Sequence, residues 1–550
     1  MRAVTLFLAA AACASEVPPP PTSTRYLTPT EHLTRASLAL RGVRPSLPDL
    51  RAVDADPSSL AAIVDRYLAS PEFGETVRDL HNEVWLLRHQ QVGISLPPLP
   101  GTTMNEMNAS IFEEPLKLVE DVVMTDQPYT QIVTADYTMA DPIVATAWGL
   151  PHSGAPAWER TQRIDPPDKA GILTSPAIFV RYRSSGFNNN RGRANAISRG
   201  LLCHDFLDSQ IRVDSSIDIS RPDIVNNAVV NNPSCAGCHQ TLDPLASYFF
   251  GYPYGPLALD KITYPLDIYN TDKWNSWFLV TNRPPAYFGE DVVGLEGLGA
   301  AIAADPRFAR CAAIHFASYL TERDHRELSP LWIAELQAAF TKDHFNAKHL
   351  ARAIVLSDEL RAVSDDDPVD AEGVIGYQKL RPAQLRRMLR DLTGFEWHGT
   401  SHDIIGGRWQ AGPFDYLDDD TTGYRVLAGG IDSFFVTEPV HTMTATASLV
   451  VRTAAAKAAQ HVVAHDRFAP RDARTLFTET DVTAADEPSV RAQLAVLHGR
   501  IYGELLGPDD ERVTETYSLF RGALAASGDP ARAWTVTLAG MLSDLRAVYY

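Results

Sequence analysis

Long apolar runs are missing from this sequence of 550 residues. A transmembrane helix needs about 20 consecutive and mainly apolar residues, and no run approaches that length. Basic residues are also outnumbered, because 49 Lys and Arg stand against 68 Asp and Glu and give a formal net charge of −19. An acidic surface repels phosphate backbones, so we expect no nucleic-acid partner.

Cysteine is scarce as well, with five residues in the chain, yet two of them stand in a specific pattern. Cys235, Cys238 and His239 spell C-x-x-C-H, the attachment pattern of c-type haem. Each thiol can form a thioether with the porphyrin edge, and the histidine then ligates the iron from the proximal side. We therefore predict one covalently bound haem c, held by both cysteines, with His239 as the metal ligand.

Two other interpretations of the motif are weaker. A structural zinc site would need two further ligands at finger-like spacing, and no second C-x-x-C or H-x-x-x-H follows nearby. A thioredoxin-like dithiol would need a strand followed by a helix, whereas the segment before Cys235 is rich in Asn and Pro. The sixth iron ligand stays open, because the sequence has no methionine between His239 and Met388.

A group of arginines follows residue 180 in an otherwise acidic chain. Its members Arg181, Arg183, Arg191, Arg193 and Arg199 are candidates to bind the haem propionates through charge-assisted hydrogen bonds, and we expect Arg181 and Arg199 to do so. The alternative is a solvated loop whose positive charge offsets the acidic residues around it.

The first residues have the features of an export signal. Met1-Arg2 supplies a positive charge, a short apolar segment follows, and small residues stand directly before Cys13. This order resembles a bacterial lipobox, so we expect Cys13 to be lipidated and to anchor the protein to a membrane. The alternative is an ordinary signal peptide cleaved nearby. Both place the chain outside the cytoplasm, in the periplasm or on the outer membrane.

Cys203 and Cys311 are the two cysteines left without a role. In an oxidising compartment outside the cytoplasm, two such thiols are natural disulfide partners. Two separate buried thiols are the alternative, since a cysteine without a partner packs as a small apolar residue.

Apolar residues recur at helical spacing through most of the chain, which predicts a mainly α, multi-domain protein with a loop-rich haem module. A chain of 550 residues is also too long for one hydrophobic core. We divide it into a signal peptide or lipobox (1–13), a Pro-rich tether (14–26), an N-terminal helical domain (27–150), a haem-binding module (151–292), a helical module (293–364) and a C-terminal helical domain (371–550).

Four stretches resemble modules of the large planctomycete-type cytochrome c proteins, which are strings of domains of unknown function. They are residues 113–150 with Ala135-Asp136-Tyr137-Thr138, residues 171–174 with Arg199 to Cys203, residues 232–239 with Asp243-Pro244 after them, and residues 308–360. The resemblance covers residues 27–363 well and 371–550 weakly. It implies an exported haem protein and specifies no substrate.

We therefore expect a monohaem c-type cytochrome-like protein that takes part in extracytoplasmic electron transfer with an unidentified redox partner. Two alternatives stay open. One is a haem-dependent, peroxidase-like oxidoreductase, which would need an open coordination position on the iron. The other is a non-redox cell-surface scaffold in which the C-x-x-C-H motif is structural.

Overall fold

The computed structural model describes residues 24–89, 98–162, 169–208, 214–254, 264–266, 268–364, 376–400, 404–405, 408–409, 413–419 and 423–550. It is 61% helix and 4% strand, which confirms the prediction of a mainly α, multi-domain protein. None of the described helices has the length and hydropathy of a membrane-spanning segment. Cys13, the tether up to residue 23 and the acidic linker 365–370 lie outside the described residues.

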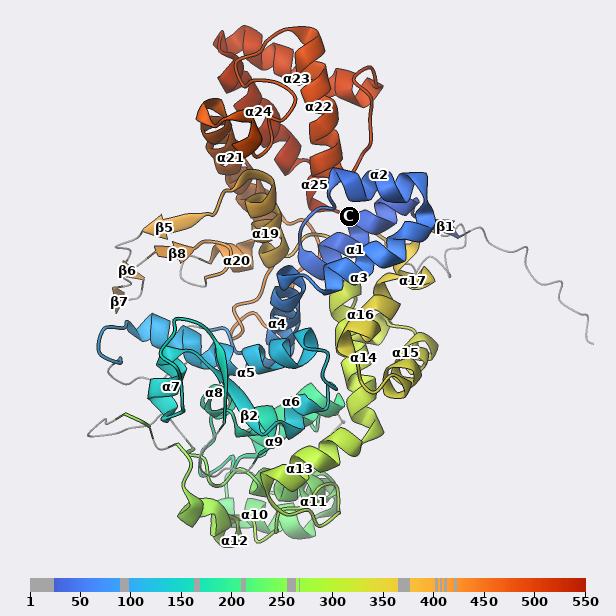
Figure 1. Cartoon of the computed structure of the whole chain (residues 1–550). Helices are drawn as coiled ribbons and strands as arrows, with labels where there is room; N and C mark the ends of the chain where they lie inside the picture. The colour runs from blue at the N-terminus through green and yellow to red at the C-terminus, as the bar shows by residue number, and fades with distance from the viewer. Residues whose placement is uncertain are drawn as a thin grey trace, which may run out of the picture.

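Residues 24–364 form the larger, N-terminal body, drawn from blue to yellow in Figure 1. Its helices are α1 (Pro29–Arg41), α2 (Leu47–Ala55), α3 (Leu60–Leu68), α4 (Pro71–Trp85), α5 (Met104–Met124), α6 (Gln131–Thr134), α7 (Pro142–Trp148), α8 (Pro176–Arg181), α9 (Arg191–Leu202), α10 (Pro222–Asn231), α11 (Pro233–Ser247), α12 (Trp277–Val280), α13 (Gly294–Ala304), α14 (Pro306–Thr321), α15 (Pro330–Lys342), α16 (Ala347–Val355) and α17 (Asp358–Arg361).

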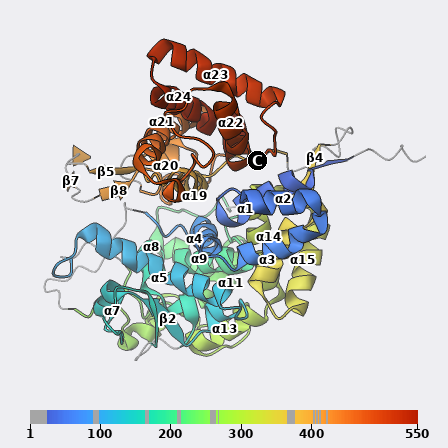
Figure 2. The same cartoon turned by 45° about the horizontal axis from the view of Figure 1, so that its top comes forward.

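Residues 376–550 form the C-terminal body, drawn in orange and red above the first body in Figures 1 and 2. Its helices are α19 (Pro382–Thr393), α20 (Tyr424–Leu427), α21 (Ala445–Phe468), α22 (Glu487–Tyr502), α23 (Glu511–Ser527), α24 (Pro530–Ser543) and α25 (Leu545–Val548). The long α21 packs along α24, and its buried face is almost entirely Ala and Val, which lets the two helices approach closely.

The strands form small antiparallel pairs at the edges of both bodies. They are β1 (Arg25–Tyr26) with β4 (Ala362–Ser364), β2 (Tyr137–Ala140) with β3 (Glu159–Gln162), β5 (His398–Thr400) with β8 (Pro413–Asp415), and β6 (Ile404–Ile405) with β7 (Arg408–Trp409). The first pair brings the beginning and the end of the N-terminal body together.

One large hydrophobic core runs through the N-terminal body from Leu33 to Leu360, with a small separate cluster at Ala140, Val144 and Ala145. The three predicted units 27–150, 151–292 and 293–364 therefore pack around the same core and are not separate globules. α14 shows why, because it packs against α9 as well as against α4, α15 and α16. The sequence periodicity shows that each helix has an apolar face but not which helix covers it.

The C-terminal body has its own core, which one residue of α1, Leu38, also joins. Buried charges fix the two bodies to one another. Arg387 on α19 is fully buried, and its Nη1 lies 2.6 Å from Oδ2 of Asp79 on α4. Arg381 pairs in the same way with Glu83 and Glu322. Such pairs are costly to break, because one removed partner leaves the other charge buried and uncompensated.

The predicted loop-rich haem module is more helical than expected where it carries the motif. Residues 222–231 and 233–247 are the helices α10 and α11. The Asn-Pro pair before the motif starts a helix: the side chain of Asn232 accepts a hydrogen bond from the Ser234 amide, and Pro233 is the first helical residue. Asn at the N-cap and Pro at the first position are a strong helix start, which the sequence interpretation took for a loop signal.

Candidate functional site

The C-x-x-C-H motif lies in the first half of α11, which differs in burial from the second half. From Pro233 to Thr241 the helix is half-buried or exposed, whereas from Leu242 to Ser247 every residue is buried. The buried half anchors α11 in the core. The exposed half therefore presents the motif at the surface on a rigid support.

Cys235, Cys238 and His239 share one face of α11. Residues three and four positions apart are neighbours on a helix, with Cβ atoms about 5–6 Å apart. Both cysteines are half-buried and neither takes part in a disulfide. The spacing thus places two thiols and an imidazole side by side on the accessible part of the helix.

His239 is held by a buried carboxylate one turn further along the helix. Its Nδ1 lies 2.9 Å from Oδ1 of Asp243, whose side chain is only 1% exposed. Arg191 on α9 binds the same carboxylate in a two-pronged contact, with Nε at 2.6 Å and Nη2 at 3.1 Å. An ionised carboxylate only accepts, so Nδ1 of His239 carries the proton and Nε2 keeps its lone pair for a ligand.

The charge on Asp243 is stabilised by these contacts. Burial raises the pKa of a carboxyl group, but the hydrogen bonds from His239 and Arg191 outweigh burial and lower the pKa of Asp243 below its usual value. The carboxylate is therefore ionised at neutral pH. A carboxylate behind a metal-binding histidine fixes the ring orientation and makes the imidazole a stronger ligand.

The geometry of the motif does not suit a zinc site. Within the described part of the chain, Cys203, Cys311 and His315 are the one group of three His, Cys, Asp or Glu residues whose ligand atoms all lie within 4.8 Å of one another. The motif residues do not converge in this way. Convergence on a point is what zinc requires, whereas thioethers attach at the edge of a macrocycle and leave its centre to the histidine.

The two arginines predicted to bind propionates make other contacts. Arg181 donates to the backbone carbonyls of Leu86 and Ser433, both at 2.7 Å, and so joins the two bodies. Arg199 lies beside Tyr182, and its carbonyl is 3.8 Å from Sγ of Cys311. Propionate binding by Arg181 and Arg199 stays a prediction.

Sequence reasoning missed Asp243 as a site residue, and it considered Arg191 only as one of the arginines that could bind propionates. The contact between His239 and Asp243 had a signal, because a histidine and an aspartate four positions apart meet on one face of a helix. The contact between Arg191 and Asp243 had none, since it joins residues 52 positions apart.

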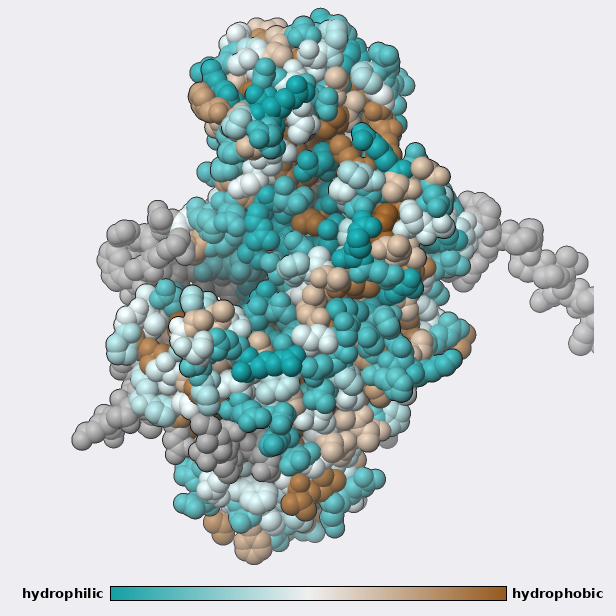
Figure 3. Space-filling model, viewed as in Figure 1, coloured by the Kyte–Doolittle hydropathy of each residue, from teal (hydrophilic) through white to brown (hydrophobic). Residues whose placement is uncertain are grey.

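Large apolar side chains are exposed next to the motif helix. Val230 on α10 is 52% exposed, and Phe278 and Leu279 on α12 are 62% and 85% exposed. Arg283, just after α12, donates to the backbone of α10 and accepts a hydrogen bond from Ser247 on α11, which ties these elements together. Figure 3 shows hydrophobic residues at this lower end of the molecule. Gathered apolar exposure of this kind marks a binding surface.

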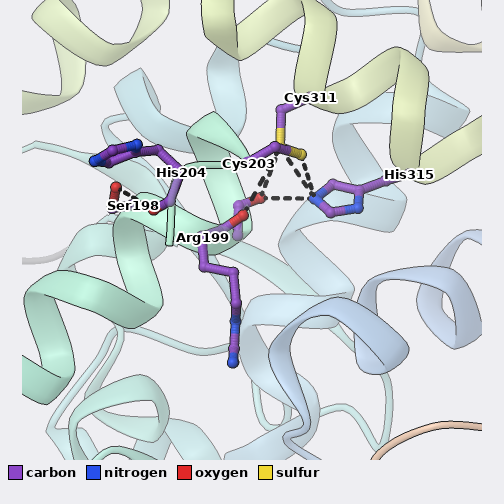
Figure 4. The surroundings of a disulfide bond; sticks show 7 residues. Ser198, Arg199, Cys203, His204, Cys311 and His315 are labelled. Atoms are coloured by element: carbon purple, nitrogen blue, oxygen red, sulfur yellow. Dashed lines mark hydrogen bonds between the residues drawn. A yellow bond between two sulfur atoms is a disulfide. The ribbon is translucent and has the colours of Figure 1, made fainter. Parts of the chain in front are cut away.

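The two cysteines that flank the motif, Cys203 and Cys311, form a disulfide. Cys203 and Cys311 are joined with an S–S length of 2.11 Å and a Cα–Cα distance of 5.2 Å (Figure 4). Cys203 ends α9 in the left-handed conformation, and Cys311 lies on α14. The bond brackets residues 203–311, the segment that contains the whole motif.

Comparison with known proteins identifies one part of the chain. Residues 27–150 match a family model described as a protein of unknown function (DUF1592). This domain is known from planctomycete cytochrome c-like proteins. The match has the same limits as the N-terminal helical domain predicted from sequence. No curated protein and no solved structure shows significant similarity to the chain.

Proposed function

We propose that this chain binds one haem c through Cys235 and Cys238 and takes part in electron transfer outside the cytoplasm. The observation that carries the proposal is the orientation of His239, whose Nδ1 is bound to the buried Asp243 and whose Nε2 is left as a ligand. A haem bound here would supply one-electron chemistry at its iron.

The residues of the site have separate roles in this proposal. Cys235 and Cys238 hold the group covalently, and His239 ligates the iron through Nε2. Asp243 keeps the proton on Nδ1 and fixes the plane of the ring, and Arg191 keeps Asp243 ionised. The exposed apolar side chains of α10 and α12 are suited to cover a porphyrin face, which is large and mainly apolar.

The helical context also favours haem over a thioredoxin-like dithiol. A reactive dithiol of that kind follows a strand, whereas the motif here begins a helix that is preceded by another helix. The match of residues 27–150 to a domain found in cytochrome c-like proteins points in the same direction.

Haem staining of a denaturing gel tests the proposal, with the full chain produced together with the cytochrome c maturation machinery. We expect a stained band, because a thioether bond survives denaturation. The variant C235S/C238S should lose the stain completely. The matched control C203S/C311S removes the same number of cysteines and should keep it. An unstained wild-type band would overturn the proposal and favour a structural role for the motif.

The visible spectrum of the stained protein then separates electron transfer from the peroxidase-like alternative. A six-coordinate iron supports the carrier function. An iron with an open sixth position in a protein that turns over peroxide would instead support the peroxidase-like function.

We also propose that Cys13 is lipidated and anchors the exported protein at the membrane. The Cys203–Cys311 disulfide supports export, because such bonds persist in oxidising compartments. Metabolic labelling with a fatty acid should mark the wild-type chain, and C13S should abolish the label. Labelling that persists in C13S would contradict the anchor.

A further inference from the structure

A third side chain lies against the disulfide. Nε2 of His315 is 3.2 Å from Sγ of Cys311 and 3.7 Å from Sγ of Cys203. Figure 4 shows the imidazole directed at the two sulfurs, whereas the ring of His204, the neighbour of Cys203 in sequence, points away from them. Two sulfurs and one nitrogen therefore converge on a single point.

The elements that hold these three atoms are rigid. Cys311 and His315 are four positions apart on α14, so both project from the same face of one helix. Cys203 is held at the end of α9, which packs along α14. The backbone carbonyl of Gly200 lies 3.2 Å from Nε2 of His315 and adds an oxygen atom to the group.

We propose that reduction of the Cys203–Cys311 disulfide creates a binding site for a thiophilic divalent cation such as Zn²⁺, with Cys203, Cys311 and His315 as its ligands. This inference does not depend on haem binding.

A dithiol reductant supplies what reduction of the disulfide requires. The reductant gives two electrons and two protons to the S–S bond, becomes a disulfide itself and leaves two thiols on the protein. Zn²⁺ then replaces the two thiol protons, and the two thiolates neutralise its charge. Cys203 is exposed, so the reductant can reach the bond from solvent.

The distances suit zinc. With Zn–S near 2.3 Å and Zn–N near 2.0 Å, a tetrahedral site holds sulfur and nitrogen about 3.5 Å apart. The two N–S distances of 3.2 Å and 3.7 Å already lie on either side of that value. Once reduced, the sulfurs have only to move apart. The carbonyl of Gly200 or a water molecule completes the coordination.

His315 is in the right protonation state to act as a ligand. Burial lowers its pKa to about 4, so the imidazole is neutral at pH 7. A zinc ligand needs a lone pair on Nε2, which requires the proton on Nδ1 and the loss of the hydrogen bond to Gly200. The metal bond replaces that hydrogen bond.

The test uses the full chain with Cys13, Cys235 and Cys238 changed to Ser, so that Cys203 and Cys311 are the only cysteines left of the five. One sample stays oxidised; the other is reduced with dithiothreitol, which is then removed without oxygen. Calorimetry with a competing chelator measures Zn²⁺ binding, and Co²⁺ reports thiolate ligands by its charge-transfer absorption. We expect one Zn²⁺ per reduced chain and none per oxidised chain.

Two matched histidine variants of that chain test whether His315 is the third ligand. His315→Ala should weaken Zn²⁺ binding by more than about tenfold and shift the Co²⁺ spectrum, because one of three protein ligands is lost. His204→Ala should bind as the parent does. Equal binding by oxidised and reduced protein, or an unchanged affinity in His315→Ala, would overturn the proposal.

Circular dichroism checks that each variant is folded in both redox states. If His315→Ala does not fold, Cys203→Ser serves in its place, because it removes a ligand at an exposed position and leaves α14 intact. Cys203→Ser should lose Zn²⁺ binding, and retention of binding would equally overturn the three-ligand site.

Discussion

The chain contains two sets of two cysteines and a histidine, and the fold treats them in opposite ways. The first set, Cys235, Cys238 and His239, is contiguous in sequence, half-exposed and bound to a charged residue. The second, Cys203, Cys311 and His315, is assembled from separate helices and closed by a disulfide.

The difference lies in what stands behind each imidazole. Behind His239 is an ionised carboxylate held by an arginine, which contacts Nδ1 and leaves Nε2 as the nitrogen that would ligate the iron in the proposed site. Next to His315 are the two sulfurs and the Gly200 carbonyl, and burial keeps the ring neutral. The same residue types thus form an accessible motif on one helix, the proposed attachment site, in one place and a cross-link between helices in the other.

The largest effect should come from removing the cross-link of the second set. C203S/C311S should lower the free energy of unfolding by about 4 kcal/mol, because the bond closes a loop whose ends are 108 residues apart in the sequence. Urea unfolding followed by circular dichroism measures the loss. All three proteins are produced without haem, so C235S/C238S is the control and should unfold at the wild-type midpoint. Equal midpoints for all three proteins would contradict the structural role of the bond.

The buried charge behind the first set should have the next largest effect. Asp243→Ala should cost about 3 kcal/mol, because it leaves the Arg191 guanidinium without its buried partner. It should also free the His239 ring, which would show as a changed iron-ligand spectrum in haem-loaded protein. Asp243→Asn keeps the shape and an acceptor, so it should cost less. A loss in Asp243→Ala below about 1 kcal/mol would argue against a role for this carboxylate in positioning His239.

The two sets should lose their contributions to folding stability at different pH values. The pKa of His315 is about 4 in the folded protein and near 6.5 in the unfolded chain. The unfolded state therefore binds more protons between these values, and stability falls as pH drops from 6.5 to 4, by roughly 2.5 kcal/mol for this residue. Asp243 has a lowered pKa, so its contribution is lost only at more acidic pH, below the usual carboxyl value.

His315→Gln provides the measurement, because glutamine can still donate to the Gly200 carbonyl but does not titrate. Unfolding free energies at several pH values should fall less steeply between pH 6.5 and 4 for the variant than for the wild type. His81 is also buried with a pKa of about 4, and His315 is one of the causes that lower it, after burial, so the difference between the two proteins reports His315 together with its effect on His81. Identical slopes would contradict the assignment.

The smallest effect is expected from a charge pair that lies close to the motif but in solvent. Arg221 and Asp223, before and within α10, pair through side chains that are 58% and 63% exposed. Asp223→Asn should leave both the unfolding midpoint and haem attachment unchanged, because solvent screens such pairs. A clear loss of haem attachment in this variant would show that the site extends along α10.

The sequence was sufficient for features that are local or countable. Helical periodicity predicted the mainly α fold, and a contiguous motif located the first set. Counting cysteines suggested the Cys203–Cys311 pair, which the structure contains. The Asn232-Pro233 helix start could also have been recognised, since both residues stand where a helix N-terminus favours them.

Features that depend on long-range packing could not be found in this way. Arg191 reaches Asp243 only because α9 lies along α11, and Arg181 donates to the carbonyls of Leu86 and Ser433, the second of which lies in the other body. The merging of three predicted modules into one core has the same origin, since an apolar helix face does not specify its partner.

The closeness of α9 and α14 also imposes an order of events on the maturing chain. Among the single disulfides that these four cysteines can form, only the Cys203–Cys311 bond leaves both motif cysteines as thiols. Attachment at the motif needs reduced sulfur, while the cross-link needs oxidised sulfur, and both arise from one newly made polypeptide. If α9 docks on α14 before the oxidant acts, the competing pairings are avoided. We expect the timing of this one helix contact to decide how much of the protein matures correctly.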